Sequence, residues 1–494
     1  MAREPRATRP RDELDTKIMR GSAWATLGFG GIQALQLVTM LVLARLLVPA
    51  DFGVVAIALS LLAIAQIAQE SGLGAALIVH RGDMRVAAAS VSVFAPVVAV
   101  GLYLVVFAVA PLAADFFDEP ILTGVLRVMA LVLVIRGFTV MPVSLLEREM
   151  MFGSMTAIEL GAGIAQATTA VVAAAAGAGV WSLVLGQLAF GAAKLVLSWS
   201  FVPLRPSPFE ARRQTLRELI GFGRYVGVAN LINYGNLNSQ NIVVGRVLGA
   251  TPLGYYSVAA RLASMPVNVI GNIVARAMFP ALARVHGDTA RFRQVWLETL
   301  QRLALLSTPS AIGVALVAEP LVVTLLGESW RPAIVPIQIL ALNGILGPLA
   351  ATSGEVFQAL RRPKLRVAYE ATYLAVSVPL LVLAARRWGL DGVAATVVLF
   401  NAAFALVLLT WMTQLLDARL RDLGYAIVRP AIGWVLMAGA IFALRPVVDD
   451  SSPGVQLVVL VGVGALVYVV GIALVARDLV TTMWVSLRGA RTSP

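Results

Sequence analysis

Long apolar runs, separated by short polar turns, follow one another along almost the whole chain. The hydrocarbon core of a bilayer is about 30 Å thick, and a helix crosses it with roughly 20 apolar residues. Of the 494 residues, 59% are hydrophobic and only 13% are charged, which is outside the range of soluble globular proteins. The sequence therefore predicts an all-α polytopic membrane protein. No stretch is left for an extramembrane catalytic domain, so we expect no catalytic residues.

The apolar runs that are long enough to cross a membrane number about fourteen. Tight turns can shift a boundary by several residues, so the count lies between twelve and fourteen. We expect the spans at 21–47, 52–79, 87–112, 121–145, 155–177, 180–203, 219–248, 254–283, 297–318, 332–358, 366–385, 389–416, 424–444 and 455–476.

A sequence phrase near the N-terminus recurs in the second half of the chain, each time between two apolar runs. In both copies an arginine precedes a glycine by eight positions across a tight polar turn. Such a repeat indicates two similar lobes around a central pathway, the plan of many transporters. The matched residues are Arg45 and Gly53 in the first copy, and Arg246 and Gly254 in the second.

The net charge of +12 is distributed in a way that argues against nucleic-acid binding. Basic residues crowd the segment before the first span and then alternate loops, whereas the opposite loops include the acidic run Asp115, Asp118 and Glu119. This positive-inside pattern predicts that both termini are cytoplasmic and that the number of spans is even. Arg386 and Arg387 do not fit this pattern, because they fall in a loop on the predicted outer side.

The sequence lacks the residues that several kinds of functional site require. Cysteine is absent, which excludes disulfides, thiolate metal sites and cysteine nucleophiles. The two histidines, His80 and His286, lie in predicted cytoplasmic loops, and no glycine-rich phosphate loop is present. We therefore expect no metal, no cofactor and no built-in ATP motor. The first apolar run is too long for a secretory signal and is followed at once by further spans, so we expect it to be retained.

Polar side chains recur at helical spacing inside four of the predicted spans. Lipid offers them no hydrogen bonds, and a charge near the bilayer centre costs at least about 2.5–3.5 kcal/mol. The stripes should therefore face protein or a water-filled cavity, although asparagine and glutamine can also hold helices together without touching a substrate. The stripes include Asn230, Asn233, Asn238 and Asn241 in the seventh span, Arg261 and Arg276 in the eighth, Gln33 and Gln36 in the first, and Gln66 and Glu70 in the second.

Arginines inside the spans indicate the sign of the charge that the cargo carries. Arg136, Arg261 and Arg276 are hard to explain as structural residues, whereas Arg45 and Arg246 lie near span ends, where they can snorkel or cap a turn. Intramembrane cations outnumber acids, so we expect an electropositive cavity that favours an anion. A guanidinium binds phosphate with two hydrogen bonds and stays protonated. Acids that could pair with these arginines or carry coupling protons are Glu70, Glu159, Glu355 and Glu370.

Three runs in the first two spans carry a family resemblance: GSAW at 21–24, LARLLVPADFG at 43–53 and SGLGAALI at 71–78. They resemble the start of polysaccharide transporters, the O-antigen and exopolysaccharide flippases of the multidrug/oligosaccharidyl-lipid/polysaccharide exporter superfamily. The segment from Asn233 to the GYY at 254–256 resembles the seventh and eighth spans of this family. The similarity covers roughly the first 290 residues, and the remainder matches only in hydropathy.

The resemblance implies a V-shaped pair of pseudo-symmetric six-helix lobes followed by two further helices. The expected parts are a cytoplasmic segment at 1–20, an N-lobe at 21–203, a cytoplasmic linker at 204–218, a C-lobe at 219–416, and the last two helices with a cytoplasmic tail at 417–494. Prolines and arginines in the linker suit a connecting segment.

The resemblance also implies a function. Such a flippase moves an undecaprenyl-pyrophosphate-linked oligosaccharide across the bacterial plasma membrane by alternating access, for surface polysaccharide synthesis. Its coupling ion would be H⁺ or Na⁺, and its partners the polymerase and glycosyltransferases of the same pathway. Arg136, Arg261 and Arg276 would bind the anionic head group, and Asn230, Asn233, Asn238, Gln66 and Glu70 would line the route. Asn241 stands where many relatives have an aspartate, which puts carboxylate coupling at that place in doubt.

Three other functions stay open. A flippase for the peptidoglycan precursor shares the superfamily, but the N-terminal runs favour the polysaccharide branch. A multidrug or cation antiporter should have acidic residues in its lumen. A membrane glycan polymerase or lipid-sugar glycosyltransferase should have a sizeable outer loop, and the outer loops expected around 113–120, 319–331 and 445–454 are short.

Overall fold

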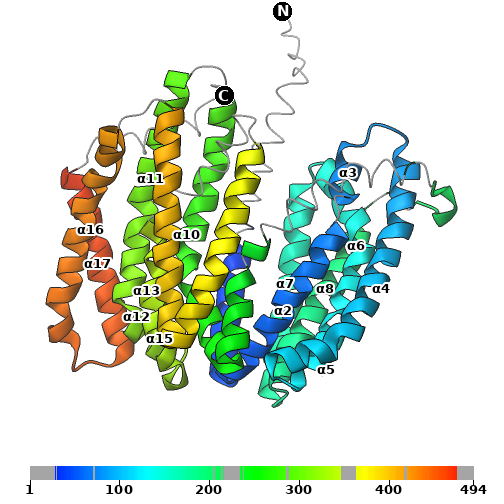
Figure 1. Cartoon of the computed structure of the whole chain (residues 1–494), viewed down its shortest axis with the longest axis horizontal. Coiled ribbons are helices and arrows are strands. Elements are labelled where there is room, and N and C mark those ends of the chain that lie inside the picture. The colour runs from blue at the N-terminus through cyan, green and yellow to red at the C-terminus, as the bar shows by residue number, and fades with distance from the viewer. Residues whose placement is uncertain are drawn as a thin grey trace, which may run out of the picture. The chain divides into compact units, whose positions relative to one another are not determined.

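The computed structural model describes residues 28, 30–70, 73–202, 204, 206–212, 215, 234–236, 238–284, 289–345, 363–416 and 420–475. Every regular element in these ranges is a helix (Figure 1). The chain divides into two compact units, Met1–Asn238 and Ser239–Pro494, which we call unit 1 and unit 2. The prediction of an all-helical membrane protein is confirmed for the described residues. The lobe boundaries predicted at 203 and 416 remain a prediction.

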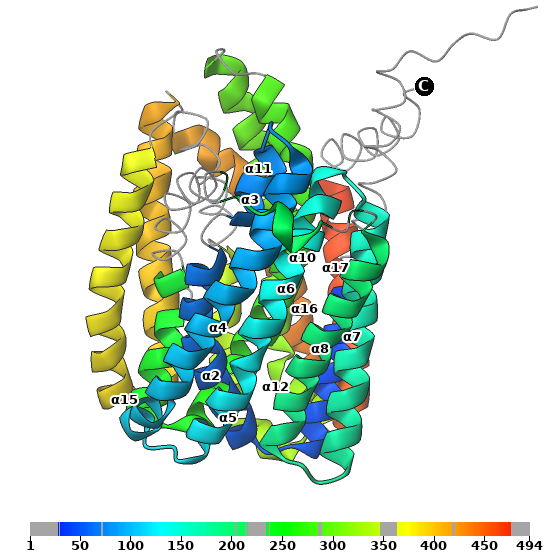
Figure 2. The same ribbon diagram turned by 90° about the vertical axis from the view of Figure 1, so that its right-hand side faces the viewer.

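Unit 1 begins with the helix Gly30–Leu46. Its further helices are α2 (Pro49–Glu70), α3 (Leu73–Val79), α4 (Met84–Phe117), α5 (Ile121–Met129), α6 (Leu131–Arg148), α7 (Phe152–Ala175), α8 (Val180–Phe201) and the short η1 (Pro208–Glu210). α4, α6, α8 and α7 stand side by side in this order (Figure 2). A core of buried side chains from α3, α4, α6 and α7 includes Leu77, Val91, Met141 and Ile158.

The boundary between the units lies at the start of a helix at 238–248, of which all but the first residue belongs to unit 2. After a break at Gly249 the chain continues as α10 (Ala250–Arg284). The remaining elements are α11 (Thr289–Leu316), α12 (Ala318–Leu325), η2 (Glu328–Ala333), α13 (Ile334–Ala341), α15 (Pro363–Leu415), α16 (Leu420–Val448) and α17 (Pro453–Val475). α11 and α12 meet at an angle of 69°. α16 and α17 pack on the α11–α12 pair through a core that includes Val317, Met437 and Leu460.

The element α15 is two helices joined at Gly389, whose φ of 62° and ψ of −146° are not helical. Glycine has no Cβ and adopts this positive φ without steric cost. In Figure 1 the first half of α15 (yellow) and the second half (orange) run in opposite directions. The 45 residues of its apolar part would extend about 68 Å as one straight helix, twice the thickness of the hydrocarbon core. The break lies where the sequence predicts a turn between two spans.

Eight helices of the described residues are long and apolar enough to cross a membrane, or nine if α11 and α12 form one broken span. α15 is counted as one of these eight helices, although its two halves run in opposite directions. α10, which carries Arg261, is not among the eight. The span number of about fourteen therefore stays a prediction.

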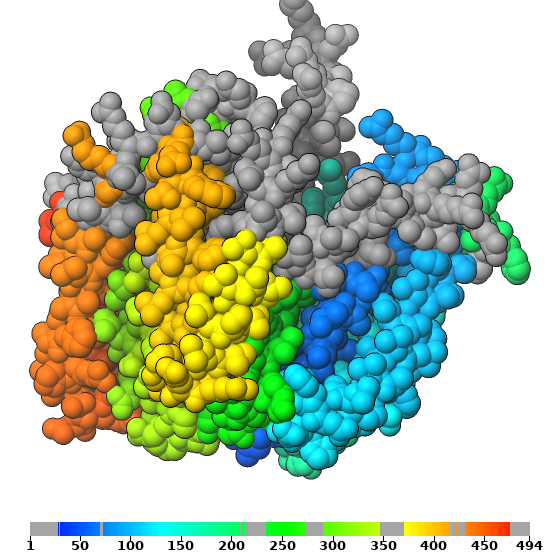
Figure 3. Space-filling model, in the orientation of Figure 1, coloured from blue at the N-terminus to red at the C-terminus, as the bar shows by residue number. Residues whose placement is uncertain are grey.

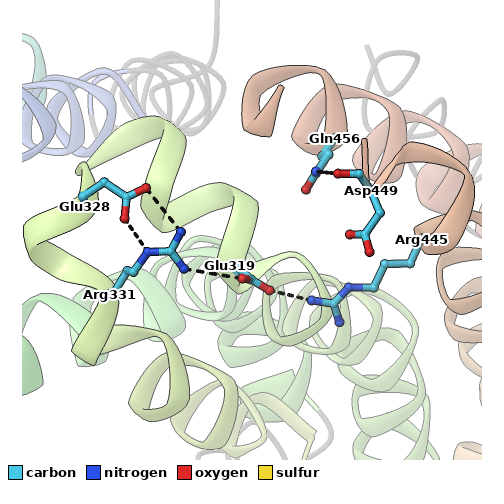
Figure 4. A network of polar contacts seen from close by, with 6 residues as sticks. All are labelled: Glu319, Glu328, Arg331, Arg445, Asp449 and Gln456. Atoms are coloured by element: carbon cyan, nitrogen blue, oxygen red, sulfur yellow. Dashed lines mark hydrogen bonds and ion pairs between the residues drawn. The ribbon is translucent and has the colours of Figure 1, made fainter. Parts of the chain in front are cut away.

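An ion-pair network joins α12 and η2 to the end of α16 (Figure 4). Glu319 accepts a hydrogen bond of 2.7 Å from Arg445 and lies 3.7 Å from Arg331, which in turn pairs with Glu328. The hydrogen bond from Arg331 lowers the pKa of Glu328, which lies outside the apolar helices, so Glu328 is ionised at neutral pH. The network bridges sequence positions that are 126 residues apart.

We predict that this network contributes little to stability in spite of its good geometry. The Arg445 and Glu319 side chains are 39% and 45% exposed, and exposed ion pairs are worth about 0.2–1 kcal/mol. Arg445→Gln should therefore lower the free energy of unfolding by at most about 1 kcal/mol, and salt should erase the difference because it screens exposed charges. Thermal unfolding of the two proteins in detergent at low and high salt checks this. A larger loss that persists in high salt would contradict it.

Candidate functional site

The structure brings two of the sequence-predicted cavity residues together in unit 1. The Arg136 guanidinium on α6 donates a hydrogen bond of 3.0 Å from Nη1 to Oε1 of Gln66 on α2. Both side chains are half-buried. Gln66 is neutral and orients the guanidinium, which also has a further interaction in the structure. A guanidinium has the fork geometry that suits an oxyanion.

A second contact between α2 and α6 lies about one turn later on α2 and one turn earlier on α6. The buried Gln69 donates from Nε2 to the carbonyl oxygen of Leu133 over 2.8 Å. Gln69 and Gln66 are three residues apart on α2, and Leu133 and Arg136 are three apart on α6, so the two hydrogen bonds form two rungs of a ladder. We call these four residues the α2–α6 ladder. The sequence analysis selected Gln66 and Glu70 and missed Gln69, although the spacing of three residues between Gln66 and Gln69 is also helical.

Arg136 lies near the middle of a membrane-spanning helix pair. α5 and α6 form one candidate span, Ile121–Arg148, of 28 residues. Arg136 lies about 22 Å from its first residue and about 18 Å from its last, at 1.5 Å per residue. An arginine at this depth is too far from either surface for its side chain to reach water by snorkelling along lipid.

The acidic residue Glu159 has a different partner from the one expected. Its carboxylate on α7 forms an ion pair with Lys194 on the neighbouring helix α8. In the structure Glu159 thus pairs with Lys194 and not with one of the deep arginines, and a role for it in carrying coupling protons stays a prediction. Lys194 also lies over the ring of Phe190, 5.8 Å from its centroid. The reason is packing: α7 and α8 are adjacent, which sets the two side chains opposite each other.

Three of the predicted residues in the seventh and eighth spans have described side chains. Asn238 donates to the carbonyl oxygen of Tyr234 over 3.1 Å, within its own helix. Asn241 is half-buried, and Arg261 is an exposed residue of α10. The hydroxyl of buried Tyr256 on α10 donates to Gln240, which holds α10 against the preceding helix.

Other predicted residues lie outside the described residues. Asn230 and Asn233 fall in an undescribed segment. The backbones of Glu70 and Arg276 belong to α2 and α10, but their side chains are outside the described set. Their roles in the site stay predictions.

A polar chain of three side chains links three helical segments of unit 2. Tyr373 donates to Oδ1 of Asn401 over 2.6 Å, and Nδ2 of Asn401 donates to Oδ1 of Asn343 over 3.0 Å. The rings of Phe400 and Phe404 pack on Tyr373 with centroids 4.9 and 5.2 Å away. The sequence did not reveal this group, because each residue is a single polar position in its own apolar run.

The two copies of the sequence repeat have the same local form. Each places a break between two helices, at Leu47 and Val48 in the first copy and at Gly249, with φ of 93°, in the second. Both arginines, Arg45 and Arg246, are exposed, whereas both glycines, Gly53 and Gly254, are buried. Asp51 supports the first turn by accepting a hydrogen bond of 3.3 Å from the Val48 N–H.

The described residues contain no group of three or more histidine, aspartate or glutamate side chains that could hold a metal ion. The polar contacts described above offer hydrogen bonding and charge: the Arg136 guanidinium at mid-span in unit 1, and amide and phenol groups in unit 2.

Comparison with known families identifies the protein class. Residues 42–336 match the model of a family described as polysaccharide biosynthesis protein. The chain belongs to this family. The match spans the α2–α6 ladder and both copies of the repeat, and the resemblance predicted from the N-terminal runs is confirmed.

Curated relatives support the family assignment along most of the chain. The succinoglycan biosynthesis transport protein ExoT of Rhizobium meliloti is 31% identical over 338 residues, 67% of either chain. The lipopolysaccharide biosynthesis protein WzxC of Escherichia coli is 25% identical over 77% of either chain. The teichuronic acid biosynthesis protein TuaB of Bacillus subtilis is 25% identical over 73% of this chain and 75% of its own length.

Solved structures show the fold of this family member. The lipid II flippase MurJ in an inward closed conformation has a TM-score of 0.74 and covers 92% of this chain and 99% of its own, at 12% identity. An inward-facing multidrug resistance transporter of the MATE family has a TM-score of 0.63 and covers 78% and 94%, at 16% identity. At these identities the similarity concerns the fold alone.

Proposed function

We propose that this transporter of polysaccharide biosynthesis moves an undecaprenyl-pyrophosphate-linked oligosaccharide from the cytoplasmic to the outer leaflet of the bacterial plasma membrane. In this proposal both termini are cytoplasmic. The observation that carries it is Arg136, a guanidinium near the middle of a spanning helix pair that Gln66 holds in place. A permanent cation at this depth needs a reason in the function, since it is costly to insert.

A pyrophosphate head group fits the chemistry of Arg136 better than a cationic drug does. The planar guanidinium forms two parallel hydrogen bonds with phosphate oxygens and stays protonated at any physiological pH. In the proposal Arg261 and Arg276 assist it, and Asn230, Asn233, Asn238, Asn241, Gln66 and Glu70 line the route for the sugar. The polyprenyl tail stays in lipid while alternating access carries the head group across.

Coupling and partners belong to the proposal as well. H⁺ or Na⁺ is the coupling ion, and Glu70 is the carboxylate of the described helices closest in sequence to the ladder. The polymerase and glycosyltransferases of the same pathway supply and consume the cargo, since a flippase acts between glycan assembly and polymerisation.

A peptidoglycan-precursor flippase is the second candidate, favoured by the fold similarity to MurJ. That similarity has 12% identity, whereas the relatives named for polysaccharide synthesis reach 31%. Both cargoes are lipid-linked pyrophosphates, so the same arginine chemistry serves either, and only the glycan distinguishes them.

Deletion of the gene tests the proposal. Lipid extracts of the deletion strain, analysed by mass spectrometry, should show complete oligosaccharide units on undecaprenyl pyrophosphate accumulating while surface polysaccharide disappears. Reintroduction of the gene should reverse both changes. Unchanged lipid-linked glycan and surface polymer would contradict the proposal, and accumulation of the peptidoglycan precursor would favour the second candidate.

A further inference from the structure

The segment that follows α8 is attached to unit 1 at two places. Val202 is buried in the core of α3, α4, α6 and α7, and Leu204 packs against the same core. Further along, the backbone N–H of Arg212 donates to Oγ of Ser90 on α4 over 3.1 Å. We call the described residues 202, 204 and 206–212 the docked linker.

One aromatic residue of the docked linker has no protein cover. Phe209 is 98% exposed, the highest value among the exposed large apolar side chains of the described residues. It lies in η1, in a turn that the hydrogen bond of 3.0 Å from the Glu210 N–H to the Ser207 carbonyl oxygen closes. Burial of a phenylalanine side chain is worth about 1.5–3 kcal/mol relative to exposure in water. A phenylalanine presented outward on a fixed turn therefore favours an apolar partner.

The position of the docked linker along α4 indicates which partner this is. Ser90 lies about 4.5 Å along the helix axis from Val93, the first exposed large apolar residue of α4. From Val93 an exposed apolar column continues through Val97, Val100 and Leu104 at helical spacing. Such a column on a spanning helix faces lipid chains. The linker contact thus lies one turn beyond the start of the lipid-facing surface, at the level of the head groups. Figures 1 and 3 show η1 projecting from the flank of unit 1 beside α4.

Exposed cations surround the same end of α4. Arg212 of the docked linker is exposed, as are Arg81 and Arg85 at the start of α4. The electrostatic attraction of one arginine to an anionic bilayer surface raises the equilibrium constant for its binding to that surface about fivefold. Aromatic and cationic residues together are the composition of segments that lie in the membrane interface.

We propose that the docked linker is a membrane-interface anchor, in which Phe209 inserts among the head groups and Arg212, Arg81 and Arg85 bind acidic phospholipid. This attachment is independent of the cargo that the protein carries. It ties the connection between the two predicted lobes to one leaflet.

The absence of cysteine allows a direct test. The full-length variant Phe209→Cys carries an environment-sensitive fluorophore and is reconstituted into vesicles of phosphatidylcholine with or without phosphatidylglycerol. We expect blue-shifted emission, quenching by a nitroxide placed at the head-group level of the lipid, and stronger quenching by spin-labelled phosphatidylglycerol than by the spin-labelled zwitterionic lipid. The matched control Ser452→Cys, in the exposed turn between α16 and α17, should report water.

A second variant separates lipid recognition from mere closeness to the bilayer. Arg212→Gln in the Phe209→Cys background should reduce the preference for phosphatidylglycerol by up to about fivefold, with unchanged unfolding temperature. The proposal is overturned if the label at position 209 is as water-exposed as the label at 452 in both lipids. It is also overturned if the blue shift persists in detergent and grows with protein concentration, which would identify a second protein copy as the partner, or if the two lipids quench equally in both variants.

Discussion

Export of the lipid-linked glycan should fall about 10- to 100-fold in Arg136→Ala, with the protein still present in the membrane. The reason is the loss of a charge-assisted contact to phosphate, worth about 1.5–3 kcal/mol, at a place where lipid and neutral amides offer no substitute. Export is measured as the ratio of surface polysaccharide to accumulated undecaprenyl-linked units in the complemented deletion strain.

Two variants make this result specific. Arg136→Lys should restore only part of the export, because a point charge replaces a fork with two parallel donors. Arg127→Ala is the matched arginine control: Arg127 lies 4.2 Å above the Phe107 ring and donates to the Phe107 carbonyl oxygen over 3.3 Å, a structural role. The Arg127→Ala variant should therefore keep export within a factor of about two of the unmodified protein. Full export in Arg136→Ala would remove Arg136 from the cargo path and leave it a packing role.

Glu159→Ala should destabilise the protein by about 1–3 kcal/mol. The substitution removes the ion-pair partner of the Lys194 ammonium inside unit 1, and only the electrostatic attraction to Glu147 remains. A poorly compensated charge in the membrane is costly. The estimate is below that for a fully buried pair, because the Lys194 and Glu159 side chains are 27% and 36% exposed. Thermal unfolding of the purified protein in detergent and in lipid measures the loss.

The double variant Glu159→Ala with Lys194→Met supplies the control. Removing both charges removes the desolvation cost together with the attraction, so most of the stability lost in Glu159→Ala should return. Equal losses in the single and the double variant would show that the pair contributes through packing and not through charge.

Helix class and turn positions were predictable from the sequence because both depend on local properties. Apolar runs of spanning length leave the backbone no hydrogen-bond partners outside its own helix, so the chain must be helical there. The break at Gly389 coincides with the predicted boundary between two spans, since glycine marks the turn. α4 begins at Met84, earlier than the predicted 87, because Asp83 caps its first turn by accepting hydrogen bonds from the Arg85 and Val86 N–H groups.

The candidate site was predictable as residues but not as contacts. Arg136 and Gln66 stood out as polar positions within apolar runs, yet they are 70 residues apart and meet only because α2 packs on α6. Helical spacing finds stripes on one helix and carries no information about which helix lies opposite. For the same reason Lys194 was not recognised as the partner of Glu159, and the chain from Tyr373 through Asn401 to Asn343 left no spacing signal.

The α2–α6 ladder limits how unit 1 can deform during a transport cycle. Its two rungs, Gln66 with Arg136 and Gln69 with Leu133, have the same three-residue spacing on both helices. A slide of α2 along α6 by one full turn, about 5.4 Å, would break both rungs at once, inside a medium that offers no replacement partners. We therefore expect this pair of helices to move together as one strut. In the proposed transport cycle, the movement that exposes Arg136 first to one side of the membrane and then to the other would take place at other helix contacts and carry the strut along.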